Sequence, residues 1–179
     1  MTIGIDVDDT ITKTTETLNS IPGLTRELFD EILTRPDSVP DLDERLKEVF
    51  GNMEVFDNAI EVINDLKSKG NKIVIITARG GILDVLVPIT KKFIKDKGIK
   101  IDDAIFYQER KGDACIKAGV DIFIDDNEIV LDEVKEKGIP TIRFSEVAVN
   151  SKHQVIHSWL ELKDYLSKWG DNNGKNNWC

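Results

Sequence analysis

Short apolar runs alternate with longer amphipathic stretches along most of the chain. Buried strands are predicted at the run that leads from Ile3 into Asp6 and at residues 73–77, 104–107, 122–124 and 141–144. Helical periodicity separates these runs at residues 58–69, from near Pro88 to near Gly98, at 112–118, up to Gly138 and at 159–168. Strands that alternate with helices require right-handed crossovers between parallel neighbours. The pattern therefore predicts an α/β fold with a doubly wound parallel sheet.

Residues 12–55 interrupt this alternation. Their apolar residues recur at helical spacing, as in Leu42, Leu46 and Val49, while Pro36 and Pro40 divide the segment into separate helices. We therefore expect a small all-helical cap at 12–55, inserted after the first strand of a core made of residues 1–11 and 56–170. The polar segment 171–179 is predicted to be a disordered tail.

Composition narrows the classes of partner. A chain of 179 residues that is 40% hydrophobic suits one domain with a small insertion. Its net charge of −9 argues against a long nucleic acid, whereas a small phosphorylated ligand needs only a metal ion and a few donors. Neither a signal peptide nor a membrane helix is expected, and Cys115 and Cys179 form no disulfide framework. These features favour a cytoplasmic protein, and they leave its oligomeric state unknown.

Polar side chains follow each of the first four predicted strands. In an open parallel sheet the carboxyl ends of the strands meet at one edge, where ligands bind. The residues expected to converge there are Asp6 and Asp8 after the first strand, Thr77 and Arg79 after the second, Lys111 beyond the third, and Asp125 and Asp126 after the fourth.

Two acidic pairs at one edge indicate a hard divalent cation, and ligands that are all oxygen favour Mg²⁺ over Zn²⁺. Asp6, Asp125 and a main-chain carbonyl could hold the ion. Thr77 and Lys111 would then supply a hydroxyl group and a positive charge for phosphoryl oxygens. A carboxylate could attack phosphorus to form an aspartyl phosphate, and Asp8, on the same face as Asp6, could protonate the leaving alcohol and later activate water.

The order of these motifs resembles that of the haloacid dehalogenase superfamily. The matching segments are Asp6-Val7-Asp8-Asp9-Thr10, Ile75-Ile76-Thr77, Lys111 and Ile124-Asp125-Asp126. The resemblance implies that Asp6 is the nucleophile and Asp8 the acid/base. It also implies that the carbonyl of Asp8 and the side chain of Asp125 bind Mg²⁺, with Asp126 binding directly or through water. Dehalogenase members lack the second Asp of the first motif, so Asp8 favours phosphoryl chemistry, and residues 12–55 resemble the small helical cap of many members.

A narrower resemblance concerns the substrate. The segments 76–79, 111, 124–127 and 157–161 are similar to those of 5'(3')-deoxyribonucleotidase-like proteins. This similarity implies a nucleoside monophosphate as substrate, bound by Thr77, Ala78, Arg79 and Lys111. Those nucleotidases hold the base with cap aromatics, and this cap offers only Phe29 and Phe50, with Phe56 at its exit. Another small phosphomonoester is therefore the alternative substrate.

Other functions compete with the phosphatase hypothesis. A phospho-receiver domain also combines an acidic pair with Asp, Thr and Lys, but there the lone Asp lies mid-chain and the Thr and Lys come last. A non-enzymatic regulatory module that binds phosphate on the same core is a second alternative. A phosphatase acting on polynucleotide ends is a third, which the acidic charge disfavours.

Several individual residues have two interpretations. Lys117 also precedes the fourth strand, but Lys111 follows the third strand more closely. Arg79 is either a substrate contact or part of a structural salt bridge. Asp9 points away from Asp6 on an extended chain and is expected to be a turn or cap residue. Asn127 either orients the metal ligands or caps the next helix.

His153 and His157 are four residues apart, a spacing that would place them on one face of a helix. No third ligand lies nearby in the sequence, so we do not expect a metal site there.

Overall fold

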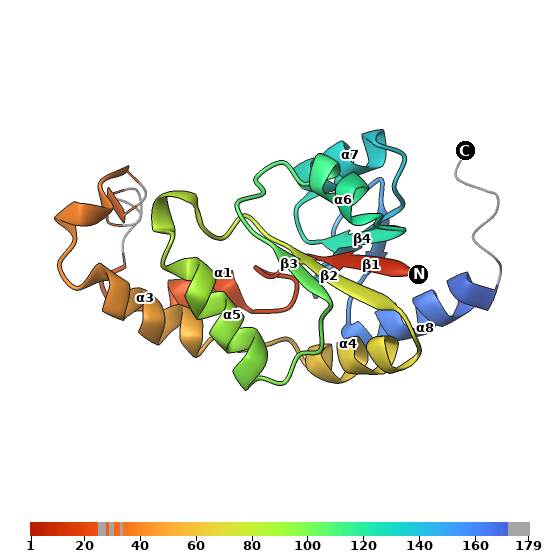
Figure 1. Cartoon of the computed structure of the whole chain (residues 1–179), viewed down its shortest axis with the longest axis horizontal. Coiled ribbons are helices and arrows are strands. Elements are labelled where there is room, and N and C mark those ends of the chain that lie inside the picture. The colour runs from red at the N-terminus through yellow and green to blue at the C-terminus, as the bar shows by residue number, and fades with distance from the viewer. Residues whose placement is uncertain (25–27, 29–30, 33, 172–179) are drawn as a thin grey trace.

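Six parallel strands form the central sheet of the computed structural model, which describes residues 1–24, 28, 31–32 and 34–171 (Figure 1). The order across the sheet is β3-β2-β1-β4-β5-β6. The strands are β1 (Thr2–Ile5), β2 (Lys72–Ile76), β3 (Asp103–Ile105), β4 (Ile122–Asp125), β5 (Thr141–Phe144) and β6 (Gln154–Ile156). After β3 the chain returns to the other side of β1, so the sheet is doubly wound, as predicted.

Helices cover both faces of this sheet (Figure 1). Ile73 and Ile75 of β2 point to one face, where they share a core with α4, α5 and α8, while Val74 and Ile76 point to the other face, toward α6 and α7. This two-residue alternation is the normal geometry of a strand. The helices are α4 (Ala59–Ser68), α5 (Leu86–Asp96), α6 (Gly112–Ala118), α7 (Glu128–Glu136) and α8 (Trp159–Asp171).

The sequence pattern located five of the six strands and missed β6. The predicted strand at 104–107 is shorter, because β3 ends at Ile105 and Tyr107 adopts a positive φ of 65°. The suggestion that His153 and His157 share a helix face is wrong, because they flank β6. β6 contains only two apolar residues, Val155 and Ile156, whereas residues 104–107 form an apolar run of four; pairing with β5 is what makes the shorter segment a strand.

Residues 12–55, here called the helical insertion, contain α1 (Thr14–Asn19), the 3₁₀ helix η1 (Pro36–Ser38) and α3 (Leu42–Gly51). The chain enters and leaves at neighbouring points: the amide of Lys13 donates to the carbonyl of Glu54 at 2.9 Å, and the amide of Phe56 donates to the carbonyl of Ile11 at 3.0 Å. Helix α3 packs beside α5 (Figure 1). The predicted cap residue Phe29 lies outside the described residues.

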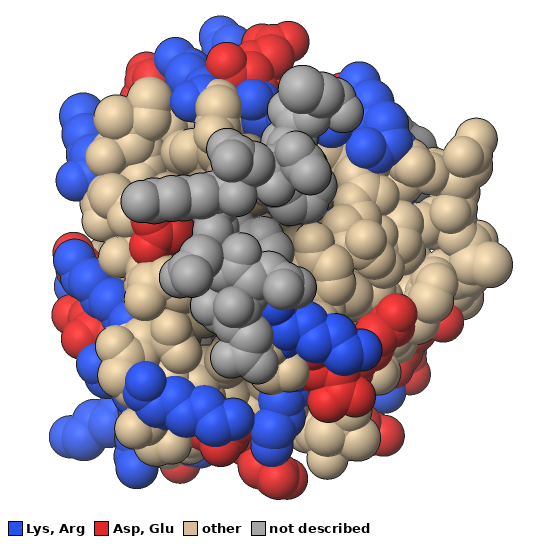
Figure 2. Space-filling view, turned by 90° about the vertical axis from the view of Figure 1, so that its right-hand side faces the viewer, with Lys and Arg blue, Asp and Glu red and all other residues tan. Residues whose placement is uncertain are grey.

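Helix α8 extends to Asp171, so the first residue of the predicted tail is helical, and 172–179 lie outside the described residues. None of the helices in the described part of the chain combines the length and apolarity that crossing a membrane requires. At the end of the molecule opposite α3, Lys and Arg side chains are interspersed with Asp and Glu (Figure 2).

Candidate active site

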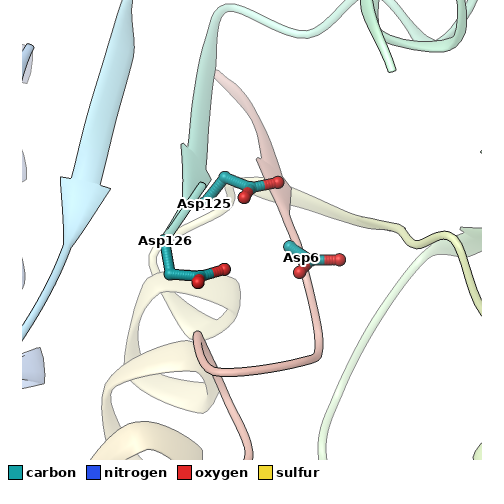
Figure 3. Close-up of side chains that lie close together, drawn as sticks. All are labelled: Asp6, Asp125 and Asp126. Carbon is teal, nitrogen blue, oxygen red and sulfur yellow. The ribbon is translucent and has the colours of Figure 1, made fainter. Parts of the chain in front are cut away.

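The reversal of strand order beside β1 brings the first and fourth predicted motifs together. In the paired register Ile5 of β1 lies beside Ile124 of β4, and the amide of Asp6 donates to the carbonyl of Ile124 at 3.0 Å. Asp6 therefore leaves its strand next to Asp125, although more than a hundred residues separate them. Figure 3 shows the carboxyl groups of Asp6, Asp125 and Asp126 gathered at this edge of the sheet.

These three carboxylates form a cluster with oxygens within 4.8 Å of one another. Asp6 is 5% exposed and Asp125 is 1% exposed, while Asp126 is half-buried. Lys111, at the start of α6, lies between two of them: its Nζ is 2.6 Å from Oδ1 of Asp6 and 2.8 Å from Oδ2 of Asp125. Buried acidic groups this close together require positive charge nearby. Lys111 supplies one such charge.

The electrostatics of the cluster favour further positive charge. Burial raises the pKa of Asp6 to about 8, opposed by Lys111 and reinforced by Asp125 and Asp8. Burial, with the charges of Asp125 and Asp9, also raises the pKa of Asp126 to about 7. Carboxylates that resist ionisation together would be stabilised as anions by a bound cation. Three clustered carboxylates with no His or Cys among them are a donor set that fits a hard ion such as Mg²⁺.

Asp8 lies two residues beyond Asp6 and is held by Arg79. Nη2 of Arg79 donates to Oδ1 of Asp8 at 2.8 Å, and Nε donates to Oδ2 at 3.0 Å. The hydroxyl of Thr14 also donates to Oδ1, at 2.6 Å. Burial alone would raise the pKa of Asp8, but the charge and hydrogen bonds of Arg79, with the bond from Thr14, outweigh it and lower the pKa. Asp8 is therefore fixed in position and favoured as a carboxylate.

Arg79 also joins the core to the helical insertion. It is 4% exposed, its Nη1 donates to the hydroxyl of Thr90 on α5 at 3.0 Å, and its guanidinium carbon lies 5.0 Å from the ring centroid of Phe50. Its Nη2 lies 3.3 Å from the sulfur of Met53. Of the two roles considered for Arg79, the structure shows the salt bridge, which it forms with Asp8. Arg79 also borders the cavity described below.

The other predicted site residues lie around the same edge. Thr77 follows β2 directly, is fully buried, and its hydroxyl accepts a hydrogen bond from the amide of Arg79 at 3.2 Å. Ala78 is exposed and faces the cavity beside Asp8. Lys117 is exposed, in contrast to the buried Lys111 that contacts Asp6.

Asp9 and Asn127 have supporting contacts. Asp9 has a φ of 51°, and its carboxylate accepts hydrogen bonds from the amide of Thr15 at 2.8 Å and from the Thr15 hydroxyl, in the first turn of α1. Asn127 both orients a carboxylate and caps a helix. Its main-chain amide donates to Oδ1 of Asp125 at 2.8 Å, and its side-chain oxygen caps α7 by accepting from the main-chain amide of Ile129. Asn127 therefore orients a carboxylate of the cluster while it starts a helix.

A cavity of about 840 Å³ opens beside Asp8, between the helical insertion and the loop after β2. Its lining includes Tyr107, which lies after β3 and is 52% exposed. The apolar pattern predicts Tyr107 as the end of a strand and does not mark it as a site residue. Its position depends on a left-handed backbone conformation that the sequence pattern does not predict.

The two histidines do not meet. The ring of His153 is buried between the hydroxyl of Thr141, at 2.7 Å, and Oδ1 of Asp132, at 2.9 Å. His157 is exposed and its Nδ1 lies 2.6 Å from the carbonyl of Ser145. Both are bound within the structure and lie apart from the Asp6 cluster.

No family model and no curated protein sequence matches this chain. Solved structures do match it. A predicted phosphoglycolate phosphatase from Haemophilus somnus is 14% identical with a TM-score of 0.64, covering 92% of this chain and 96% of that chain. The L-2-haloacid dehalogenase from Xanthobacter autotrophicus is 10% identical with a TM-score of 0.63, covering 93% and 98%. A haloacid dehalogenase superfamily hydrolase from Ehrlichia chaffeensis is 14% identical with a TM-score of 0.60, covering 93% and 96%. The chain therefore has the fold of haloacid dehalogenase superfamily hydrolases.

Proposed function

We propose that this chain is a cytoplasmic, magnesium-dependent phosphomonoesterase that forms an aspartyl phosphate on Asp6. The observation that carries the proposal is the cluster of Asp6, Asp125 and Asp126 around the ammonium group of Lys111, with Asp8 two residues from Asp6. Structural neighbours that include a predicted phosphoglycolate phosphatase support the same reaction class.

In the first step, a carboxylate oxygen of Asp6 attacks phosphorus, and the bond from phosphorus to the ester oxygen breaks. Asp8 enters this step in its protonated form, which the contacts of Arg79 disfavour, and gives that proton to the leaving alcohol, so that it becomes the carboxylate that Arg79 stabilises. Lys111 is placed to neutralise charge on Asp6 and on phosphoryl oxygens, because its Nζ already lies 2.6 Å from Asp6.

In the second step, water attacks phosphorus, the carboxylate of Asp8 takes the proton of that water, and the bond to Asp6 breaks to release inorganic phosphate. Arg79 favours the carboxylate form of Asp8 that this step needs. Asp6, Asp125 and Asp126 are the side chains that would hold Mg²⁺, together with the carbonyl of Asp8. When bound, Mg²⁺ would neutralise phosphoryl charge and reduce its repulsion by Asp6.

We also propose that the helical insertion, residues 12–55, acts as a cap over a core of residues 1–11 and 56–170. The neighbouring entry and exit of the insertion, at Lys13 with Glu54 and at Ile11 with Phe56, support a hinge there. Thr77, Ala78 and Arg79 are the proposed substrate contacts from the core. For the substrate, the sequence resemblance supports a nucleoside monophosphate, with another small phosphomonoester as the alternative.

The test compares Asp6→Asn with the matched control Asp164→Asn, which changes an exposed carboxylate on α8. With acetyl phosphate or an aryl phosphate and Mg²⁺, we expect Asp6→Asn to lose at least about a thousandfold in kcat, since removal of a nucleophile is among the largest single losses in enzymes. Asp164→Asn should match the wild type. Turnover by Asp6→Asn near the wild-type level would refute the proposal, and stable phosphorylation without turnover would favour the regulatory module.

A further inference from the structure

We infer that the site takes phosphate monoesters of hydrophobic alcohols, with the hydrocarbon part of the alcohol in the cavity beside Asp8. This inference rests on the proposed function and narrows its substrate class. It selects the alternative of a phosphomonoester other than a nucleotide.

The position of Asp8 determines where the alcohol must go. In the proposed reaction Asp8 gives a proton to the leaving oxygen, so the alcohol begins within hydrogen-bond distance of this carboxyl group. Asp8 lines the cavity of about 840 Å³, and that volume lies in the range of about 300–1,000 Å³ that is typical of small-molecule sites. A leaving group larger than a few atoms therefore has room to extend from Asp8 into this cavity.

The walls of the cavity are mostly apolar and come from both parts of the chain. The helical insertion contributes residues whose side chains also belong to the hydrophobic core, and the segment after β2 contributes the opposite wall. Representative lining residues are Leu18, Ile32, Leu46 and Phe50 from the insertion and Leu83 and Leu86 from the core. Walls of this kind favour hydrocarbon over hydrated sugar.

Among the described lining residues, the buried polar side chains already have hydrogen-bond partners within the protein. The guanidinium group of Arg79 is paired with Asp8 and bound to Thr90. The hydroxyl of Thr14 donates to Asp8 and lies 2.8 Å from the hydroxyl of Thr12. Ribose hydroxyls or the amide edge of a base placed against these groups would lose water without gaining a free partner, and this loss disfavours nucleosides.

The charged residues that line the rest of the cavity, Arg45, Glu109 and Arg110, are exposed and carry both signs. Arg110 approaches Glu133, with Nε 3.9 Å from Oε1. These three side chains lie in contact with solvent, so that their charges stay hydrated.

Two large apolar side chains form an exposed wall that a hydrocarbon would cover. Ile82 is 62% exposed and Tyr107 is 52% exposed, and both line the cavity. Tyr107 has a φ of 65°, a conformation that is rare for a bulky residue, and its ring packs on Gly80, where an added Cβ would lie 2.5 Å from Cε1. Strained backbone and exposed apolar surface at one wall are features of ligand sites.

The decisive experiment measures kcat/KM for a series of straight-chain alkyl phosphates from ethyl to octyl, with Mg²⁺. These alcohols differ little in basicity, so the series varies mainly the apolar surface that is buried. We expect kcat/KM to rise about fourfold per added methylene until the cavity is full. A flat series, or higher kcat/KM for nucleoside monophosphates and sugar phosphates than for octyl phosphate, would overturn the inference.

A pair of matched variants tests the wall itself. Ile82→Asp places a charge in the cavity, whereas Ile116→Asp places the same charge on α6 at an isoleucine that is 54% exposed and lies outside the cavity lining. We expect Ile82→Asp to lower kcat/KM for octyl phosphate at least about tenfold and Ile116→Asp to match the wild type, because only the first charge lies in the cavity that the hydrocarbon would fill. Equal kcat/KM for octyl phosphate in the two variants would contradict the inference.

Measurements of binding affinity show whether the inference about the substrate fails independently of the proposed function. If acetyl phosphate is not hydrolysed at all, the proposed function fails. Calorimetry with Asp6→Asn then still measures the affinity for octyl phosphate, naphthyl phosphate and a nucleoside monophosphate. We expect the two hydrophobic esters to bind at least about tenfold more tightly than the nucleotide, and the ratio of octyl to naphthyl phosphate distinguishes an aliphatic from an aromatic alcohol. Equal or tighter binding of the nucleotide would overturn the inference.

Discussion

Arg79 donates two parallel hydrogen bonds to the carboxylate of Asp8. The same guanidinium group donates a hydrogen bond to Thr90 of α5 and lies over the ring of Phe50 in the helical insertion. This planar fork matches the carboxylate geometry, which a lysine ammonium group cannot reproduce. At the scale of single residues, Arg79 is therefore the group that orients the side chain of Asp8, the proposed proton carrier.

Arg79→Lys keeps the positive charge and removes the fork. We expect kcat for ethyl phosphate, whose leaving alcohol must be protonated, to fall about tenfold to a hundredfold, because a freely rotating Asp8 is misplaced for proton transfer. The KM should change less, since Lys111 and the carboxylates proposed to bind Mg²⁺ are intact. Steady-state kinetics measure both constants, and an unchanged kcat would show that charge alone suffices at position 79.

At the scale of elements, β1 approaches β4 and the segment before it so closely that a side chain at Gly4 has no room. An added Cβ would lie 2.7 Å from Cδ2 of Phe123 and 3.1 Å from Cγ1 of Val120. The close approach matters for the site, because β1 and β4 carry Asp6 and Asp125. The glycine therefore leaves room for the side chains of Phe123 and Val120 to pack over β1, close to the strand ends from which Asp6 and Asp125 project.

Gly4→Ala should lower the free energy of unfolding by about 1–3 kcal/mol, the usual cost of overpacking a core. Gly51→Ala is the matched control, because nothing lies within 4 Å of the Cβ it adds at the end of α3. That control should be neutral or slightly stabilising. Urea unfolding of both variants measures the difference, and equal stability would contradict the close packing of β1.

Asp102 joins three elements at the opposite edge of the sheet. Its carboxylate accepts from Nζ of Lys67 on α4 at 2.6 Å and from the amide of Ile73 on β2 at 2.8 Å, just before β3 begins. The hydrogen bond from Lys67 and that from Ile73 lower the pKa of Asp102 below its usual value of 3.8. The unfolded chain thus binds a proton at this residue more readily than the folded chain does.

The contribution of Asp102 to stability is therefore complete above pH 3.8 and is lost as pH falls through the lower pKa of the folded state. We expect Asp102→Asn to be less stable than the wild type at neutral pH and the difference to shrink below that pH. Urea unfolding over a pH series measures both effects. If the difference in the free energy of unfolding between Asp102→Asn and the wild type stays constant down to the pH at which the protein unfolds, the stabilising role assigned to the Asp102 carboxylate is wrong.

At the scale of the whole molecule, the carboxylate cluster joins Asp6 to Asp125 and Asp126, which are distant in the sequence, so a bound ion should stabilise the entire fold. Mg²⁺ at tenfold its dissociation constant should add about 1.4 kcal/mol to the free energy of unfolding. A chelator should reverse the gain, and Asp125→Asn should abolish it, whereas Asp164→Asn should retain it. Thermal unfolding with and without Mg²⁺ provides the measurement. An equal gain in Asp125→Asn would place the ion elsewhere.

The sequence by itself determined the fold class and most of the elements. Apolar runs and helical periodicity are local properties, and they located β1, β2, β4 and β5 with errors of one or two residues. It also identified the polar residues at the strand ends, because parallel strands place their carboxyl ends at one edge whatever the details of packing. The expectation that Asp6 and Asp125 meet follows from this rule.

Only the tertiary structure decided which partner each polar residue takes. It brings Lys111 rather than Lys117 to Asp6, and it pairs Arg79 with Asp8. It adds β6, separates the two histidines, and turns Tyr107 into a wall of the cavity beside Asp8. These outcomes depend on contacts between segments distant in sequence and on one strained backbone angle, neither of which leaves a local pattern. The proposed reaction follows from the residues at the strand ends, whereas the cavity beside Asp8 exists only where the helical insertion packs against the core.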